Sequence, residues 1–420
     1  MMGRILAVCL AATLCFGCDD EGEDTDGMGG SVGGTPGVGG APGMGGAPGD
    51  GGAPGVGGAP GMGGDPGAGG APSAGGAPGV GGAPGVGGAP GMGGAPGMDE
   101  ASCEPTVLAP AEPLDLTAVC EDQPVATPIE GELGTLENGT EYLFNIPENA
   151  HSLLFAFHGG GGSKEDNFRR IEPTLIFREA LARGYAVVSL DSIKHTQENP
   201  DNLQWSEAPI AENQDVANVA AVIDALEGVP GLIAGNAPIV LIGISNGGSM
   251  VSRAAQREDV TAAASYISNT RYFDVDGARV PPVIFMVGES DAGRSCGSTL
   301  DLLRKIRGNG GVAARRVNRP ERASIGVFTR IPGVDCALSK GVVSVLIEEG
   351  HLADDGTVVE LPSGGRGKRA LAQRLPAPLN TVVGVGQVVD VLTELAAGHS
   401  PSAEFNGVVF DFLDAHRGGQ

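Results

Sequence analysis

The chain carries, at positions 238–247, the run Pro238-Ile239-Val240-Leu241-Ile242-Gly243-Ile244-Ser245-Asn246-Gly247. Its apolar first half predicts a buried parallel strand, and a G-x-S-x-G motif completes it. A glycine two residues before and after Ser245 leaves room for a sharp strand-to-helix turn, because a Cβ there would clash. Such a turn holds a serine hydroxyl exposed beside a base, and the base makes that hydroxyl a reactive nucleophile. We therefore expect Ser245 to be a nucleophile at the end of a strand.

Further segments predict a sheet of mostly parallel strands. Apolar runs typical of buried strands lie at Ser152–Phe157, Ala186–Leu190, Ser265–Ser268, Val283–Val287 and Val388–Leu392, with an earlier antiparallel strand at Thr140–Ile146. Helical patterns lie at Phe168–Gly184, Asp215–Leu226, Ser339–Glu349 and Phe405–His416. Because strands and helices alternate, we expect a doubly wound α/β fold with ligands at the carboxyl ends of its strands. The roughly 320 residues from 101 to 420 suffice for one such domain.

A glycine run follows the strand Ser152–Phe157 and reads His158-Gly159-Gly160-Gly161-Gly162. Glycines let main-chain N–H groups approach a substrate oxygen with no side chain in the way. We expect an N–H of Gly159 or Gly160, together with that of Asn246, to form an oxyanion hole. His158 is assigned to the architecture of this loop and to the edge of the substrate site, not to general base chemistry.

A carboxylate and a histidine must complete such a site. Asp291 ends the Gly-Glu-Ser-Asp loop after the strand Val283–Val287, where an acid can fix the tautomer of an imidazole. Glu289 is the neighbouring alternative. Trp205, the only tryptophan, lies on a loop after the strand Ala186–Leu190. It either stacks on a substrate or packs its own loop.

The base must lie beyond the acid, which leaves three histidines in the last part of the chain. His416 ends the terminal helix and is expected at the surface. His351 follows a predicted helix and Gly350, so it is expected to cap that helix. His399 follows a predicted strand and an Ala-Ala-Gly loop and precedes the last helix, so we favour it as the base, with His351 as the alternative. The long gap before His399 requires an insertion over about 296–380 that could form a cap over the site.

The cysteines indicate an oxidising compartment. Of seven cysteines, two lie in a predicted signal segment and Cys18 follows it, so Cys103, Cys120, Cys296 and Cys336 remain. Short loops favour the pairs Cys103–Cys120 and Cys296–Cys336, although four cysteines allow three connectivities. No C-x-x-C occurs among these four cysteines, so a cysteine metal site is not expected.

The N-terminal region predicts export and a spacer. Residues 1–17 have a positive residue, a short apolar run and a small residue before Cys18, as in a lipoprotein signal, and an ordinary signal peptide is the alternative. Residues 18–100 are acidic and then repeat Gly-Gly-Ala-Pro-Gly-x, which lacks side chains for a core and predicts a disordered linker. A collagen-like trimer is the other reading of this glycine period. The net charge of −25 argues against a nucleic-acid partner.

One set of segments consists of His158–Gly162, Trp205, Asn213-Gln214-Asp215-Val216 and 243–250. These segments resemble those of the exported polyhydroxybutyrate depolymerase and feruloyl esterase families. The resemblance covers roughly residues 140–295. It implies an α/β-hydrolase fold and a serine esterase that acts outside the cytoplasm. It also implies the roles given above to Ser245, the glycine loop and Asp291. The chain departs from these families beyond Asp291, because Gly-Gly-His followed by Trp-Pro is absent at both His351 and His399.

We therefore expect transfer of an acyl group to water by Ser245, His399 and Asp291, without a cofactor or metal. The expected partner is a polymeric or small ester, and the expected form is a monomer tethered to a membrane only through lipid on Cys18. The alternative hypothesis is a surface-displayed binding or adhesion lipoprotein that has the fold without the turnover.

Overall fold

A computed structural model of the protein describes residues 103–418, apart from Asp122, Asn149, 198–203, 233–236, 269–272, Asp274, 276–278 and 292–294. The expected signal segment, the lipidation at Cys18 and the Gly/Pro-rich linker lie outside the described residues. Among the helices that are described, none is both long and apolar enough to cross a membrane.

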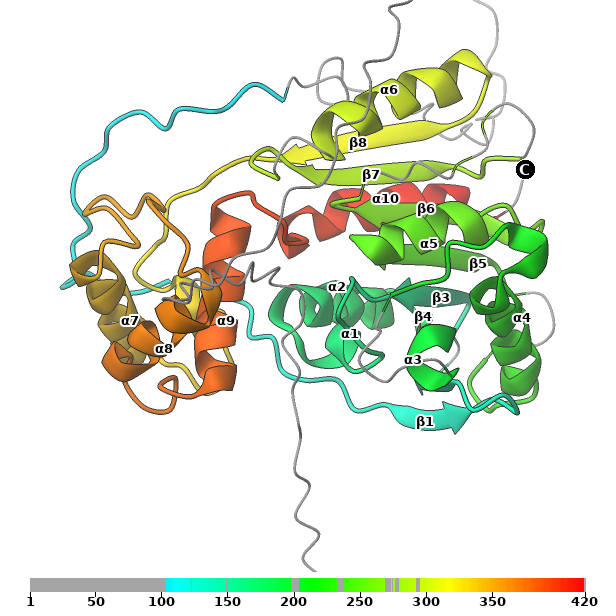
Figure 1. Ribbon diagram of the computed structural model, residues 1–420, viewed down its shortest axis with the longest axis horizontal. Coiled ribbons are helices and arrows are strands. Elements are labelled where there is room, and N and C mark those ends of the chain that lie inside the picture. The colour runs from blue at the N-terminus through cyan, green and yellow to red at the C-terminus, as the bar shows by residue number, and fades with distance from the viewer. Residues whose placement is uncertain are drawn as a thin grey trace, which may run out of the picture. The chain divides into compact units, whose positions relative to one another are not determined.

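Within the described residues, eight strands form one sheet in the order β1-β2-β4-β3-β5-β6-β7-β8 (Figure 1). Their bounds are β1 Glu132–Thr135, β2 Glu141–Asn145, β3 Ser152–Phe157, β4 Tyr185–Leu190, β5 Ile239–Ile244, β6 Val260–Tyr266, β7 Val283–Gly288 and β8 Ala313–Asn318. β1 and β2 pair antiparallel, β2 also pairs antiparallel with β4, and all later neighbours are parallel. The doubly wound, mostly parallel sheet predicted from the sequence is confirmed.

Helices cover both faces of this sheet (Figure 1). Their bounds are α1 Asp166–Arg169, α2 Ile171–Ala182, α3 Ile193–Gln197, α4 Gln214–Leu226, α5 Asn246–Ala254, α6 Ser295–Gly308, α7 Cys336–Glu348, α8 Gly364–Arg374, α9 Val382–Leu395 and α10 Asn406–His416. Short 3₁₀ turns lie at Ile210–Glu212, Val327–Arg330 and Ala403–Phe405. The apolar sides of α4, α5 and α6 pack on one face, and those of α2 and α10 pack on the other.

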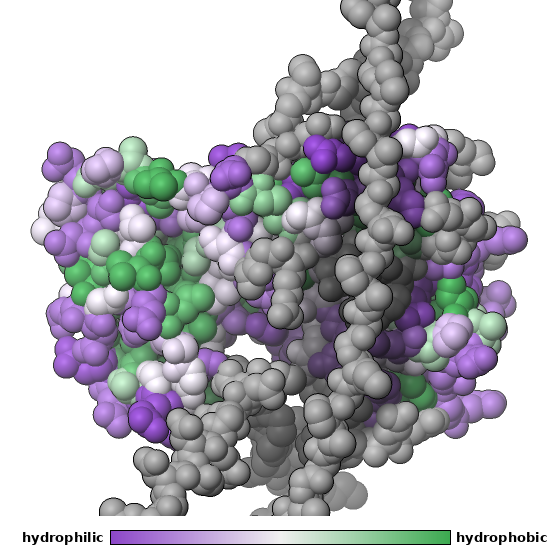
Figure 2. Space-filling view, turned by 45° about the horizontal axis from the view of Figure 1, so that its top comes forward, coloured by the Kyte–Doolittle hydropathy of each residue, from purple (hydrophilic) through white to green (hydrophobic). Residues whose placement is uncertain are grey.

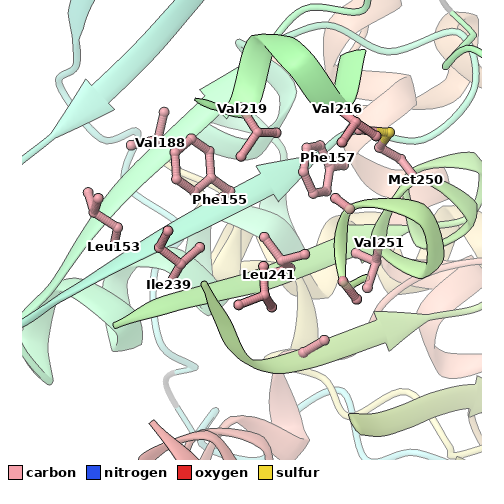
Figure 3. Packing of buried hydrophobic residues seen from close by; sticks show 14 of the residues in the cluster. Leu153, Phe155, Phe157, Val188, Val216, Val219, Ile239, Leu241, Met250 and Val251 are labelled. Atoms are coloured by element: carbon pink, nitrogen blue, oxygen red, sulfur yellow. The ribbon is translucent and has the colours of Figure 1, made fainter. Parts of the chain in front are cut away.

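The central strand β3 is buried on both sides, which explains its unbroken apolar sequence. Leu153, Phe155 and Phe157 point into one core, where they meet side chains of α4 and α5 such as Val219 and Met250 (Figure 3). The intervening residues of β3 face the second core under α2 and α10. The ends of β3 and β5 are thereby held rigidly beside each other, where the glycine loop and the turn that carries Ser245 begin.

A group of helices stands beside the sheet, and we call residues 327–395 the helical lobe (Figure 1). α7, α8 and α9 share a third core, to which Ile171 of α2 and Ala126 also belong. Figure 2 shows hydrophobic residues gathered over this lobe, where Val359, Val382 and Val383 are exposed. The predicted strand Val388–Leu392 is wrong, because it lies inside α9. Buried residues recur there at helical spacing, and Thr381 caps the helix by accepting a hydrogen bond from the Gly384 N–H at 3.0 Å.

The expected insertion over about 296–380 begins later than predicted. β8 extends the sheet, since it pairs parallel with β7 over its whole length, and α6 packs on one face of that sheet. Only the residues after β8 form the additional lobe. β8 escaped prediction because its sequence, Ala-Ala-Arg-Arg-Val-Asn, has no apolar run, as suits a strand at the edge of a sheet.

The expected disulfide pairs are also wrong. The structure pairs Cys103 with Cys296 and Cys120 with Cys336, at Cα–Cα separations of 5.9 and 5.8 Å. The segment between the first two cysteines runs along the molecule, so each of them reaches a different distant element. Cys103 reaches the start of α6, and Cys120 reaches the start of α7 in the helical lobe. Two such crosslinks are typical of an extracytoplasmic protein.

Candidate active site

Ser245 lies in a strained turn between β5 and α5. Its φ of 54° and ψ of −117° are unusual for a residue with a side chain. Its own N–H donates to Tyr266 O at 2.9 Å, and the Gly248 N–H donates to Ser245 O at 2.9 Å. A Cβ on Gly243 would overlap the carbonyl group of Gly247, so the motif glycine leaves the space that this turn requires. The packing around the turn thus maintains the strain that exposes the hydroxyl.

His399 lies between Ser245 and Asp291. Its Nε2 is 2.7 Å from Ser245 Oγ, and its Nδ1 is 2.8 Å from Asp291 Oδ1. An ionised carboxylate only accepts hydrogen bonds, so Nδ1–H donates to Asp291 and Nε2 is free to accept the Ser245 proton. The Asp291 side chain is 8% exposed, whereas that of His399 is 53% exposed. The acid is therefore shielded from water, while the imidazole faces the opening of the site.

The turn after α9 places His399. The main chain reverses at Ala397, whose φ is 49°, and the Ala397 carbonyl accepts the Ser290 N–H at 3.0 Å. This bond joins the loop of the acid to the loop of the histidine. A Cβ on Gly288 would overlap the same carbonyl, so β7 and the end of α9 approach closely. The loop that carries His399 was predicted correctly, but the element before it is a helix and not a strand.

The other candidates lie elsewhere. His351 is in the helical lobe, and its Nδ1 lies 3.1 Å from Glu360 O. The Glu289 carboxylate accepts a hydrogen bond from the Thr106 hydroxyl at 2.7 Å. His416 lies on the terminal helix, with Nδ1 2.7 Å from Phe412 O. The structure therefore brings only Asp291 and His399 of these predicted candidates to Ser245.

The glycine loop adjoins the nucleophile. A Cβ on Gly159 would lie 3.7 Å from that of Ser245, so the Gly159 main chain is next to the serine. Gly160 lies against the side chain of Gln204. Asn246 is the first residue of α5, so its N–H belongs to the positive end of a helix. All three residues line the same cavity as Ser245.

His158 and Trp205 form a buried layer under this loop. The Trp205 ring packs on Phe157 and His158, with ring centroids 5.2 and 4.6 Å apart. Trp205 is 2% exposed and does not line the cavity at Ser245, so the expectation that it contacts substrate is corrected in favour of packing. His158 borders that cavity, but the residue is only 1% exposed. Burial lowers the pKa of His158, so its ring is neutral.

A cavity of about 400 Å³ opens at Ser245 and His399 between the sheet and α9. Its apolar walls include Ile244, Ile267 and Pro401. Four charged residues also line it, namely Asp166, Arg170, Glu172 and Asp390. The Arg170 guanidinium is 2.9 Å from Asp390, so an ion pair joins the start of α2 to α9 at the cavity wall. These four residues were not singled out in the sequence, because nothing in their local pattern distinguishes them from surface charges.

Glu172 extends from the cavity wall into a buried ionic cluster. It accepts hydrogen bonds from Arg330 at 2.7 Å and from the Ala403 N–H at 2.8 Å. Arg330 also lies 3.4 Å from Glu394 on α9. Burial, with the nearby Glu394 charge, raises the pKa of Glu172 to about 7 even though Arg330 opposes the shift. In the described part of the chain, no group of His, Cys, Asp and Glu is arranged to hold a metal ion.

Comparisons with known proteins bear on the family of the chain. Among curated proteins, none matches the sequence. Similar solved structures include an esterase from Pyrococcus furiosus, with 13% identity over 45% of this chain and 81% of that one and a TM-score of 0.34. A serine hydrolase without a lid from Xanthomonas campestris has 17% identity over 47% and 87%, with a TM-score of 0.34. A ferulic acid esterase has 14% identity over 45% and 89%, with a TM-score of 0.37.

A family model described as "Alpha/beta hydrolase family" matches residues 153–411, more than half of the chain. The match runs from β3, which carries the glycine loop at its end, to α10 beyond His399. On this match the chain belongs to the alpha/beta hydrolase family.

Proposed function

We propose that this protein is a serine esterase that hydrolyses carboxylic esters through Ser245, His399 and Asp291. The observation that carries the proposal is the continuous pair of hydrogen bonds from Ser245 Oγ through His399 to Asp291, at 2.7 and 2.8 Å. This is the geometry in which an imidazole can accept the serine proton while a buried carboxylate fixes its tautomer. The site of a binding protein would not need it.

In this mechanism His399 Nε2 takes the proton of Ser245 as Oγ attacks the ester carbonyl. The negative charge on the tetrahedral intermediate is stabilised by the Asn246 N–H and by the glycine loop, each donor being worth about 3 kcal/mol. His399 then gives its proton to the departing alcohol. Water, activated by the same imidazole, attacks the acyl-enzyme and releases the acid. Every proton transfer is served by His399, so the sequence of steps calls for no cofactor.

The substrate we propose is a polyester or an ester linked to a plant polysaccharide. The resemblance of the glycine loop and the G-x-S-x-G motif to those of polyhydroxybutyrate depolymerases and feruloyl esterases supports these two classes. We further propose export and tethering through lipid on Cys18, with residues 18–100 as a spacer. The two disulfides support an oxidising location.

The test is turnover of p-nitrophenyl acetate and butyrate by the wild type, two variants of the site and one control variant. Ser245→Ala and His399→Ala are each expected to lower kcat by a factor on the order of 10⁴ or more, since either change removes the activated nucleophile. His351→Ala is the matched control, because this histidine lies in the helical lobe, and its activity is expected to equal that of the wild type. Retained turnover in Ser245→Ala would overturn the proposal, and a wild type without turnover would favour a non-catalytic binding protein.

A further inference from the structure

Trp205 makes hydrogen bonds to both segments that carry the oxyanion donors. We propose that Trp205 is a positioning residue that sets the geometry of the oxyanion hole, an inference that rests on the proposed esterase function. Its main-chain N–H donates to Asn246 Oδ1 at 2.8 Å. Its indole Nε1–H donates to His158 O, also at 2.8 Å. One residue thus joins the end of β3 to the start of α5, while its ring stays out of the cavity.

The indole bond orients the first glycine of the loop. A peptide unit is planar and trans, so its C=O and N–H point in opposite directions within one plane. The His158 carbonyl shares its peptide plane with the Gly159 N–H. When Trp205 fixes that carbonyl, it also fixes the direction of the Gly159 N–H, beside Ser245.

The second glycine is oriented through His158. A carbonyl oxygen only accepts, so His158 Nδ1–H donates to Gly159 O at 2.8 Å. This carbonyl shares its peptide plane with the Gly160 N–H, whose direction is fixed in the same way. The His158 ring itself is held against the indole, with centroids 4.6 Å apart. Trp205 therefore fixes one peptide directly and supports the side chain that fixes the next.

The contact between Trp205 and Asn246, at the start of α5, is equally constrained. The Asn246 side chain accepts the Trp205 N–H, and the Asn246 main chain supplies the remaining donor. The loop after Trp205 is anchored, because the Ser206 N–H donates to Asp215 Oδ2 at 2.7 Å. Arg253 on α5 donates to Ala208 O at 2.6 Å. The loop that follows Trp205 is thus anchored to α5, the helix that begins next to Ser245.

The chemical consequence follows from how oxyanion holes work. Donors must lie within hydrogen-bond distance of the position that the oxyanion reaches in the transition state. Two donors on separate segments meet this requirement only if the distance between the segments is held. Trp205 supplies this constraint without touching the substrate, so its loss should affect the transition state more than the binding of substrate.

The experiment compares wild type with Trp205→Phe, which keeps an aromatic ring against Phe157 and His158 but lacks the indole N–H. With p-nitrophenyl butyrate, kcat is expected to fall by about 10- to 100-fold and KM to change by less than about threefold. The diagnostic substrate is the matching thionoester. Its sulfur accepts hydrogen bonds weakly, so the ratio of oxoester to thionoester turnover should fall in the variant.

Phe410→Leu is the matched control for the loss of a buried aromatic side chain. Phe410 lies on α10 and packs on Tyr185 of β4, away from the site. This change should therefore lower the melting temperature and leave the oxoester-to-thionoester ratio unchanged. Asn246→Ala removes the acceptor of the Trp205 N–H but keeps its own main-chain N–H, and a fall in the ratio is expected again. It carries the test if Trp205→Phe does not fold.

An unchanged ratio in both variants would overturn the role of Trp205, even if their activity were lower. This result is distinct from failure of the esterase proposal, in which the wild type would show no turnover that depends on Ser245. An active, Ser245-dependent wild type with an unaffected ratio in the variants therefore rejects the positioning role alone.

Discussion

At the scale of single residues, Asp291 offers a sharp prediction. Asn in its place can keep the contact with His399 but presents an amide N–H to Nδ1, which favours the tautomer with the proton on Nε2. That tautomer cannot accept the proton of Ser245. We expect Asp291→Asn to lower kcat for p-nitrophenyl butyrate by about 10³- to 10⁴-fold with little change in KM. Glu289→Gln is the control, since Glu289 binds Thr106 and not His399, and a similar loss in both variants would contradict the assignment.

The sequence revealed the residues of the site unequally, for physical reasons. Ser245 and the glycine loop are recognisable because a tight turn and a close main-chain approach demand glycine at fixed spacing. Asp291 follows because the ends of parallel strands meet at one edge of a sheet. His399 carries no such local requirement, and elimination among three histidines was needed to select it. The role of Trp205 depends on its contacts with residues 47 and 41 positions away, which no local pattern encodes.

At the scale of elements, the packing of α2 against α9 contains an ionisable contact. Glu172 has its pKa raised to about 7 in the folded protein, above the ordinary value of 4.5. Between these two pH values the unfolded chain loses this proton while the folded protein keeps it. The contribution of Glu172 to the free energy of unfolding is therefore fully present below about pH 4.5. It declines as pH rises towards 7.

We expect this decline to appear in thermal unfolding. The melting temperature of the wild type should fall by a few degrees more than that of Glu172→Gln between pH 5 and 7.5, because glutamine does not ionise. The neighbouring Arg330 and Glu394 remain in both proteins, so the difference between the two profiles isolates Glu172. Parallel profiles would show that Glu172 is ionised throughout this range.

The strands were predictable where burial on both faces requires an unbroken run of apolar residues. β3, β4, β5 and β7 are buried on both faces and stand out as apolar runs. Part of α9 was predicted as a strand on the same ground, because its five residues Val-Val-Asp-Val-Leu are mostly apolar. Its helical period appears only over the full length from Val382 to Leu395, and it reflects the third core, which lies mainly in the helical lobe. β8 gave too little apolar signal to be found.

At the scale of the whole molecule, the two disulfides join the N-terminal segment to α6 and to the helical lobe. They close loops with sequence separations of 193 and 216 residues. Crosslinks over such long loops restrict the unfolded chain strongly, and each native disulfide typically contributes about 2–5 kcal/mol. The pairing expected from neighbouring cysteines would have closed shorter loops and left the N-terminal segment without a crosslink to the rest of the domain.

This connectivity can be tested directly. Peptide mapping without reduction should recover Cys103 linked to Cys296, and Cys120 linked to Cys336. Replacing both Cys120 and Cys336 by Ala is expected to lower the melting temperature by several degrees, because it frees the N-terminal segment from the start of α7. The matched variant, with Ala at Cys103 and Cys296, should be destabilised to a comparable extent, since its loop is of similar length. Recovery of a Cys103–Cys120 peptide from the native protein would contradict the arrangement, and with it the attachment of the helical lobe to the N-terminal segment.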